Sequence, residues 1–130
     1  AFVGFAPGNK SFDLGDGFSI EPSEGFSVIY LTAKNENEDL KSTEEIIITA
    51  MARARNTGME FNEEEDKILD PGEAPIVLEP VKALVSVPFS GKLELLDHDG
   101  NLMENNSRKF RRKFAIDGAV DQTPYYLIRK

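Results

Sequence analysis

Residues 45–55 read EIIITAMARAR and form the longest regular run in the chain. Alternate side chains of a strand point to opposite faces, so one face of this run would carry Ile46, Ile48, Ala50, Ala52 and Ala54. Ala, Met, Arg and Glu are also helix formers, and a helix is the competing interpretation. Three consecutive isoleucines followed by threonine favour β structure, and we therefore predict a strand.

The rest of the chain repeats this pattern, with short apolar or alternating runs broken by Gly, Pro, Asn and Asp. Residues 26–33, FSVIYLTA, are a second strong strand, whereas residues 60–72 read as an exposed acidic loop. Further strands are expected at 2–5, 11–14, 18–21, 75–80, 81–87, 91–97, 101–103, 110–116 and 125–129. With no convincing helix, the sequence predicts one all-β module over residues 1–130, an antiparallel two-sheet β-sandwich of jelly-roll-like form.

Composition excludes several classes of partner and site. The 130 residues suit one domain. The absence of cysteine excludes disulfides and thiolate metal sites, and the single histidine, His98, cannot build a zinc site. The formal charge of −8 argues against nucleic acid as a partner, and no apolar run approaches the roughly 20 residues that cross a bilayer. We expect a monomer that binds neither nucleic acid nor a membrane.

Catalytic chemistry is not expected. A glycosidase needs two carboxyl groups about 5–10 Å apart across a cleft, one of them with a raised pKa. The paired acids here, such as Glu63 and Glu64, fall in the acidic loop, where water solvates them. No Gly-x-Ser-x-Gly motif surrounds any serine. We predict a module that is not an enzyme.

Residues 97–101 read DHDGN and carry two alternative interpretations. Alternating oxygen ligands around a glycine are typical of calcium loops, but the twelfth position of such a loop falls on Arg108, which cannot bind a cation. Asp-Gly between apolar runs is typical of a hairpin turn. The turn is favoured, so we predict no cofactor and no metal, with a structural calcium ion as the alternative.

Residues 108–113 place five cations among six residues of an acidic chain. On a strand, Lys109, Arg111 and Lys113 would share one positive face. An exposed face paired with acidic loops is the favoured interpretation, since exposed ion pairs contribute at most about 1 kcal/mol. The alternative is a patch for an anionic polymer, where arginine forks grip sulfate or carboxylate.

A second polar cluster lies where the 45–55 run ends. Arg53, Arg55 and Asn56 are suitable donors for sugar hydroxyls, and an aromatic residue nearby in sequence or in the last strand could supply a stacking face. At least one of Tyr125 and Tyr126 is expected in the core. The candidate carbohydrate-binding residues are Arg53, Arg55, Asn56, Phe61, Tyr125 and Arg111.

Residues 46–59, together with PIVLEPV at 75–81, resemble the C-terminal β-sandwich domains attached to bacterial (β/α)-barrel glycoside hydrolases of the agarase and porphyranase type. Those domains pair an "LLTAVARAENTGM" strand with a "P-x-L-x-EPV" strand. The family often has a tryptophan after "NTGM" and another before the closing tyrosine, where this chain has Phe61 and Tyr125. Stacking on sugar would therefore be weaker or differently oriented here.

The resemblance implies a non-catalytic carbohydrate-binding module from a larger, secreted or cell-surface enzyme. It would direct a glycoside hydrolase to a polysaccharide, with an acidic or sulfated marine galactan such as porphyran or agar as the expected ligand. The alternative is a structural domain that stabilises the catalytic barrel without binding sugar, and its signature would be an exposed apolar patch. A surface-assembly domain that binds protein is the third interpretation.

Overall fold

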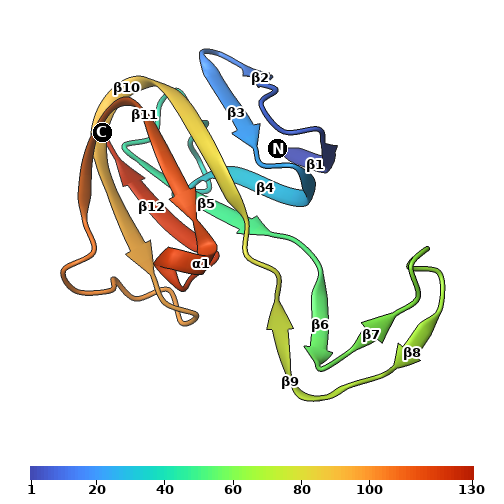
Figure 1. Ribbon diagram of the computed structural model, residues 1–130. Coiled ribbons are helices and arrows are strands. Elements are labelled where there is room, and N and C mark those ends of the chain that lie inside the picture. Colours follow the sequence, from blue (N-terminus) through green and yellow to red (C-terminus); the bar gives the residue numbers. More distant parts are fainter.

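The computed structural model describes all 130 residues and confirms the predicted all-β architecture (Figure 1). One helical turn, α1, was not expected from the sequence. The helical structure contains no segment with the length and hydropathy of a membrane-spanning helix. The elements are β1 (Phe2–Ala6), β2 (Phe12–Gly15), β3 (Phe18–Pro22), β4 (Gly25–Ala33), β5 (Glu45–Met51), β6 (Ala54–Thr57), β7 (Glu60–Phe61), β8 (Ile68–Asp70), β9 (Glu73–Leu78), β10 (Lys82–Leu96), β11 (Arg108–Asp117), α1 (Gly118–Asp121) and β12 (Tyr125–Arg129).

Eight strands form one antiparallel main sheet in the order β1-β4-β5-β12-β10-β3-β2, and β11 pairs with β10 outside this path. The two end strands approach each other through Phe2 of β1 and Phe12 of β2, whose ring centroids are 4.7 Å apart. The main sheet therefore nearly closes on itself.

Strand β10 is long and bent, and it pairs with strands in both halves of the main sheet. Its first part pairs with β3 and its last part with β12, while β11 follows its other edge. The pairing with β11 shifts between Ser86 and Ser90, where Pro88 has no N–H to donate and where Arg112 on β11 has a left-handed φ of 57°. The two strands predicted at 81–87 and 91–97 are thus one strand with a bulge.

The core lies inside the nearly closed sheet. Ile46, Ile48 and Ala50 of β5 point into it, as the alternation predicts, and Tyr126 of β12 is completely buried. Each large apolar side chain buried here contributes about 1.5–3 kcal/mol. The cluster comprises 18 buried residues, among them Phe18, Ile20, Ile29, Val85, Leu93, Phe110, Phe114, Ile116 and Ile128.

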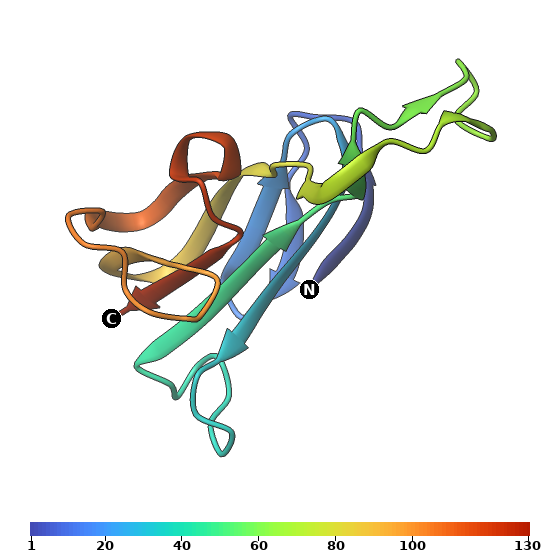
Figure 2. The same ribbon diagram turned by 90° about the horizontal axis from the view of Figure 1, so that it is seen from below.

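The run 45–55 does not continue as one strand, and this part of the prediction is wrong. Strand β5 ends at Met51, Ala52 and Arg53 belong to no strand, and Ala54 begins β6 with its side chain exposed. Residues 53–80, here called the arm, leave the body as a ribbon in which β6 pairs with β9 and β7 with β8 (Figures 1 and 2). None of these strands pairs with the main sheet, and the predicted acidic loop forms the tip of the arm.

Candidate interaction site

Four of the six predicted binding residues lie in the arm: Arg53, Arg55, Asn56 and Phe61. The other two lie in the body, Arg111 on β11 and Tyr125 on β12. Tyr125 is half-buried opposite Thr49 of β5. Tyr126 is the expected core tyrosine, and burial, with a further contribution from Asp121, raises the pKa of its phenol. The predicted residues therefore do not form one site.

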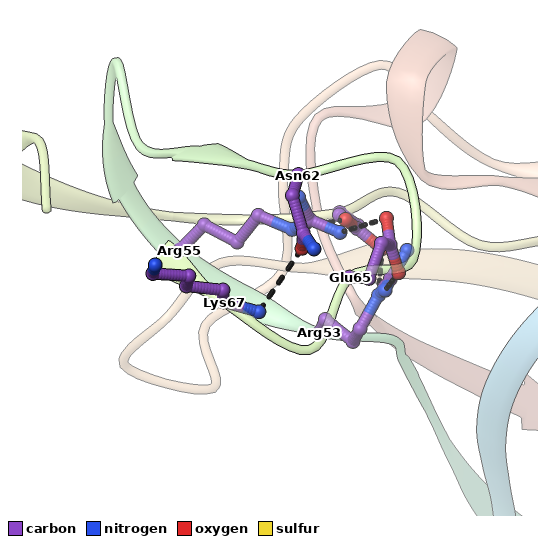
Figure 3. Close-up of polar contacts among 6 residues, drawn as sticks. Arg53, Arg55, Asn62, Glu65 and Lys67 are labelled. Carbon is purple, nitrogen blue, oxygen red and sulfur yellow. Dashed lines mark hydrogen bonds and ion pairs between the residues drawn. The ribbon is translucent and has the colours of Figure 1, made fainter. Parts of the chain in front are cut away.

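A cluster of ion pairs covers one face of the arm (Figure 3). Arg53 and Arg55 are two residues apart, so both side chains point to the same face. Arg53 Nε lies 3.2 Å from one carboxylate oxygen of Glu79, and Arg55 Nε lies 2.8 Å from the other. Both guanidinium groups also contact Glu65, with Arg55 Nη2 at 3.3 Å. Arg53, and then Arg55, hold the pKa of the Glu65 carboxyl below its ordinary value.

Phe61 and Asn56 are also engaged in contacts within the arm. The Arg55 guanidinium lies 4.7 Å from the centre of the Phe61 ring and so covers one ring face. The Asn56 amide donates to the carbonyl oxygen of Pro71 at 3.0 Å, and the Thr57 hydroxyl donates to that of Pro75 at 2.7 Å. The first bond ties β6 to the turn before β9, and the second ties it to β9 itself. Sugar binding by the four arm residues stays a prediction.

The tip of the arm folds back so that Glu65 can reach the two arginines. The Asn62 amide donates to Asp66 at 2.6 Å, and the Lys67 backbone N–H donates to the Asn62 side-chain oxygen at 3.0 Å (Figure 3). At the other end of the tip, Gly72 has a φ of 66°, and a Cβ there would overlap the Thr57 carbonyl oxygen. The conformation of this loop is therefore fixed by its own sequence.

The opposite face of the arm is mostly apolar and has no ion pairs. Ala54 lies across from Leu78, and Asn56, its one polar member, lies across from Ile76. Ile76 is 68% exposed and Leu78 is 48% exposed. An isolated two-stranded ribbon is marginally stable in water, so this face gains stability from any partner that covers it.

This apolar face continues into a cleft where the arm meets the body. Leu78 and Pro80 line the cleft from the arm, Ala50 and Val81 line it from the body, and Ala119 lines it from α1. Helix α1 is held by its N-cap, since the Asp117 side chain accepts hydrogen bonds from the backbone N–H groups of Ala119 and Val120.

Val120, also on α1, is 75% exposed but lines a different hollow, together with Arg108 and Asp121. We call the apolar surface formed by this face of the arm and the cleft beside α1 the docking corner, made by Ala54, Ile76, Leu78, Pro80 and Ala119. It was not predicted from the sequence. The one signal was the unbroken apolar run at 76–78, which lacks the alternation of a strand with one buried face.

A second concave surface lies on the body and is basic. It is lined by side chains from β10, β11 and β12 and by the last residue of the chain. We call it the basic surface: Ser90, Gly91, Lys92, Lys109, Phe110, Arg111, Arg129 and Lys130.

Some of these cations are neutralised and others are not. Arg129 lies 2.9 Å from Glu45 and 3.1 Å from Glu94, and Lys92 lies 2.7 Å from Glu94. Lys109 and Arg111 form no ion pair, and neither do Arg112 and Lys113 beside them on β11. The bulge at Arg112 turns its side chain outward too, so the strict alternation predicted for residues 109–113 does not hold.

Residues 97–101 form the favoured turn. The Asp97 carboxylate accepts hydrogen bonds from the backbone N–H groups of Asn101 and Asp99, both at 2.9 Å, and these bonds lower its pKa, with that from Asn101 contributing most. No group of three or more His, Cys, Asp or Glu side chains is placed to hold a metal ion.

Comparisons of the chain with protein-family models, with curated proteins and with solved structures found no match.

Proposed function

We propose that this chain is a non-catalytic accessory module that docks onto another protein domain through the docking corner. The observation that carries the proposal is the apolar face of the arm, which is bare along Ile76 and Leu78 and leads into the cleft beside α1. A protruding arm with a cleft at its base fits a convex, folded partner better than it fits a small ligand.

Energetics support a partner of this kind. Covering a large aliphatic side chain is worth about 1.5–3 kcal/mol, and Ile76 is 68% exposed and Leu78 48% exposed. Contiguous apolar patches are uncommon on monomeric proteins and are typical of interaction sites. The ion pairs on the other face of the arm hold the ribbon in place before it meets the partner, which reduces the entropy lost on docking.

The resemblance seen in the sequence suggests which partner. In that interpretation the chain is the β-sandwich accessory domain of a secreted or cell-surface polysaccharide-degrading enzyme, and the docking corner covers its (β/α)-barrel catalytic domain. The exposed apolar patch expected of a structural accessory domain is consistent with this proposal.

The test measures binding of the chain to isolated (β/α)-barrel catalytic domains of agarases and porphyranases by calorimetry. Leu78→Asp and Ile76→Asp each place a charge in the docking corner. Leu102→Asp is the matched control, because Leu102 is 49% exposed, as Leu78 is 48% exposed, but lies in the turn after β10. We expect binding that both corner variants weaken at least about tenfold and that the control leaves unchanged.

Two results would overturn the proposal. One is a barrel domain that binds equally well to the wild type and to both corner variants. The other is a failure of every barrel domain in the panel to bind the wild-type chain. Circular dichroism of each variant shows whether the body is still folded, so that a loss of binding is not confused with unfolding.

Carbohydrate binding is the second candidate function. The observation that favours it is the basic surface, where Lys109 and Arg111 lie exposed in a concave region without acidic partners. This site differs from the arm residues that the sequence placed first, and it keeps only Arg111 of the six predicted residues.

A further inference from the structure

We propose that the basic surface binds a polysaccharide that carries sulfate or carboxylate groups, and that the polymer runs along β11. The proposal rests on the second candidate function, carbohydrate binding, and deepens it by naming the chemical class of the ligand. It does not depend on what covers the docking corner.

The negative charge of the protein is concentrated away from this surface. The arm holds eight acidic and three basic side chains and thus accounts for five of the eight net negative charges. The arm points away from β11 in both views of the molecule (Figures 1 and 2). Because charges further apart than about 8 Å are largely screened at physiological salt, the arm does not oppose an anion bound at β11.

The cations at 109–113 of β11 are free to bind a ligand, whereas Arg108 is paired with Asp121 at 3.1 Å. Most exposed lysines and arginines elsewhere have an acidic partner, such as Lys34 with Glu45 at 2.7 Å and Lys41 with Asp16 at 2.7 Å. Lys109 and Arg111 have none, although like charges so close together repel one another. An anion would relieve this repulsion.

Protection of a strand edge is the simplest alternative explanation. Strand β11 pairs only with β10, so its outer edge is open, and lysine on such an edge prevents pairing with another chain. That explanation accounts for charge on β11 itself. It does not account for Lys130, which lines the same concave surface beyond β12 and forms no ion pair, whereas Lys92 and Arg129 are paired with Glu94.

The shape of the surface favours a polysaccharide over a nucleic acid. Single-stranded nucleic acids bind where aromatic side chains stack on bases. Here Phe110 is buried beneath the surface, and the Lys130 ammonium lies over the ring of the half-buried Phe89, 5.1 Å from its centre. Sulfate and carboxylate groups need no stacking partner. Arginine grips them with two parallel N–H donors, and lysine contributes a point charge.

Affinity electrophoresis through gels that contain one polysaccharide each tests the proposal. The panel comprises neutral agarose and xylan, sulfated porphyran and carrageenan, and carboxylated alginate, with single-stranded DNA as a separate competitor. The test variant is Lys109→Ser with Arg111→Ser. The matched control is Lys67→Ser with Lys82→Ser, which removes the same charge at exposed positions outside the basic surface.

We expect the charged polysaccharides, and not the neutral ones, to retard the wild type. The test variant should lose about tenfold in affinity, which corresponds to about 1.4 kcal/mol, and the control should lose little. Retardation should weaken as salt rises from about 0.01 M to 0.15 M, as the screening length falls from about 30 Å to 8 Å.

Each contrary outcome has a distinct meaning. Equal retardation by neutral and charged polysaccharides would overturn the polyanion proposal and leave carbohydrate binding standing. No retardation in any gel would overturn both. Release from the charged polysaccharide gels by single-stranded DNA, at a lower concentration than by the free polysaccharide, would assign the surface to nucleic acid instead. An equal loss of affinity in the test and control variants would show that net charge alone, and not this surface, is responsible.

Discussion

The guanidinium of Arg55 lies 4.7 Å from the centre of the Phe61 ring, and this contact joins β6 to β7 at the turn of the arm. The same guanidinium pairs with Glu79, just beyond β9, and with Glu65 in the tip. One side chain thus connects β7, the tip and the residue that follows β9. The polar groups on this face of the arm are paired with one another, although Val77, opposite Arg55, is 47% exposed there.

Arg55→Ala should loosen the arm and leave the body intact. It removes the contact with Phe61, worth about 0.5–1 kcal/mol at an exposed site, together with the ion pairs. We expect faster amide hydrogen exchange in residues 54–78 and a fall of less than about 5 °C in the melting temperature, because no core residue changes.

Lys67→Ala is the control, since Lys67 is an arm cation without an ion pair. Unchanged exchange in the arm of Arg55→Ala would show that the observed contacts do not stabilise the ribbon. A fall of more than about 10 °C would mean that Arg55 supports the body instead.

The stability of the arm should also decrease at acidic pH. Arg53, and then Arg55, lower the pKa of Glu65 from its ordinary value of 4.5. A carboxyl group with a lowered pKa in the folded state stabilises that state above its unfolded pKa, and this contribution is lost as pH falls through the folded pKa. We expect an NMR titration of the Glu65 side-chain carbon with a midpoint below 4.5, and loss of arm protection as Glu65 is protonated.

The comparison for this titration is Arg53→Ala, which removes the larger cause of the shift. In that variant the Glu65 midpoint should move up toward 4.5. A midpoint that is the same in both proteins would show that the Arg53 contact does not persist in solution.

The body should fold without the arm. Residues 54–78 can be replaced by Asn-Gly, because the Glu79 backbone N–H already donates to the Arg53 carbonyl oxygen at 2.9 Å, as at the open end of a hairpin. None of the 18 residues in the buried cluster lies in the deleted segment. We expect a folded protein whose melting temperature is within about 5 °C of the wild type, without binding to barrel domains and with retardation by charged polysaccharides unchanged. An unfolded product would show that the arm is part of the folding unit.

The alternation of apolar and polar residues along the sequence predicted those strands that have one face in the core. Ile46, Ile48 and Ala50 point inward on β5, and the last strand was placed at residues 125–129 as the structure has it. Such strands are predictable because their side-chain pattern is set by a single, shared interior. The turn at 97–101 was also predicted, since a side-chain oxygen of Asp97 determines it locally.

The arm could not be predicted in this way, because its strands have no core to face. Ala52 and Ala54 continue the pattern of β5 in sequence, yet the pairing of β5 with β4 stops at Met51, although β4 itself extends further, and the chain leaves the body there. Arg53 and Arg55 looked like free donors, because their partners Glu65 and Glu79 are 10 to 26 residues away. Contacts of that sequence separation depend on the folded shape of the loop and leave no local signal.

Gly91 should be intolerant of any side chain, because it forms the floor of the basic surface. A Cβ at this position would overlap the carbonyl oxygen of Arg129 on β12 and would lie 3.1 Å from the Phe110 ring. The first of these atoms is backbone within a paired strand and cannot move without breaking the pairing of Lys92 with Arg129. We expect Gly91→Ala to destabilise the fold by about 1–3 kcal/mol and to accelerate amide exchange on both strands.

Gly100→Ala is the comparison, because nothing lies within 4 Å of a Cβ built at Gly100. Only the local cost of its φ of 83° applies, about 1 kcal/mol, and the effect should be confined to the turn. Chemical denaturation gives the two free energies, and amide exchange shows where each effect lies. If Gly91→Ala were no more disruptive to Lys92 and Arg129 than Gly100→Ala, the close approach of β10 to β12 would not exist in solution.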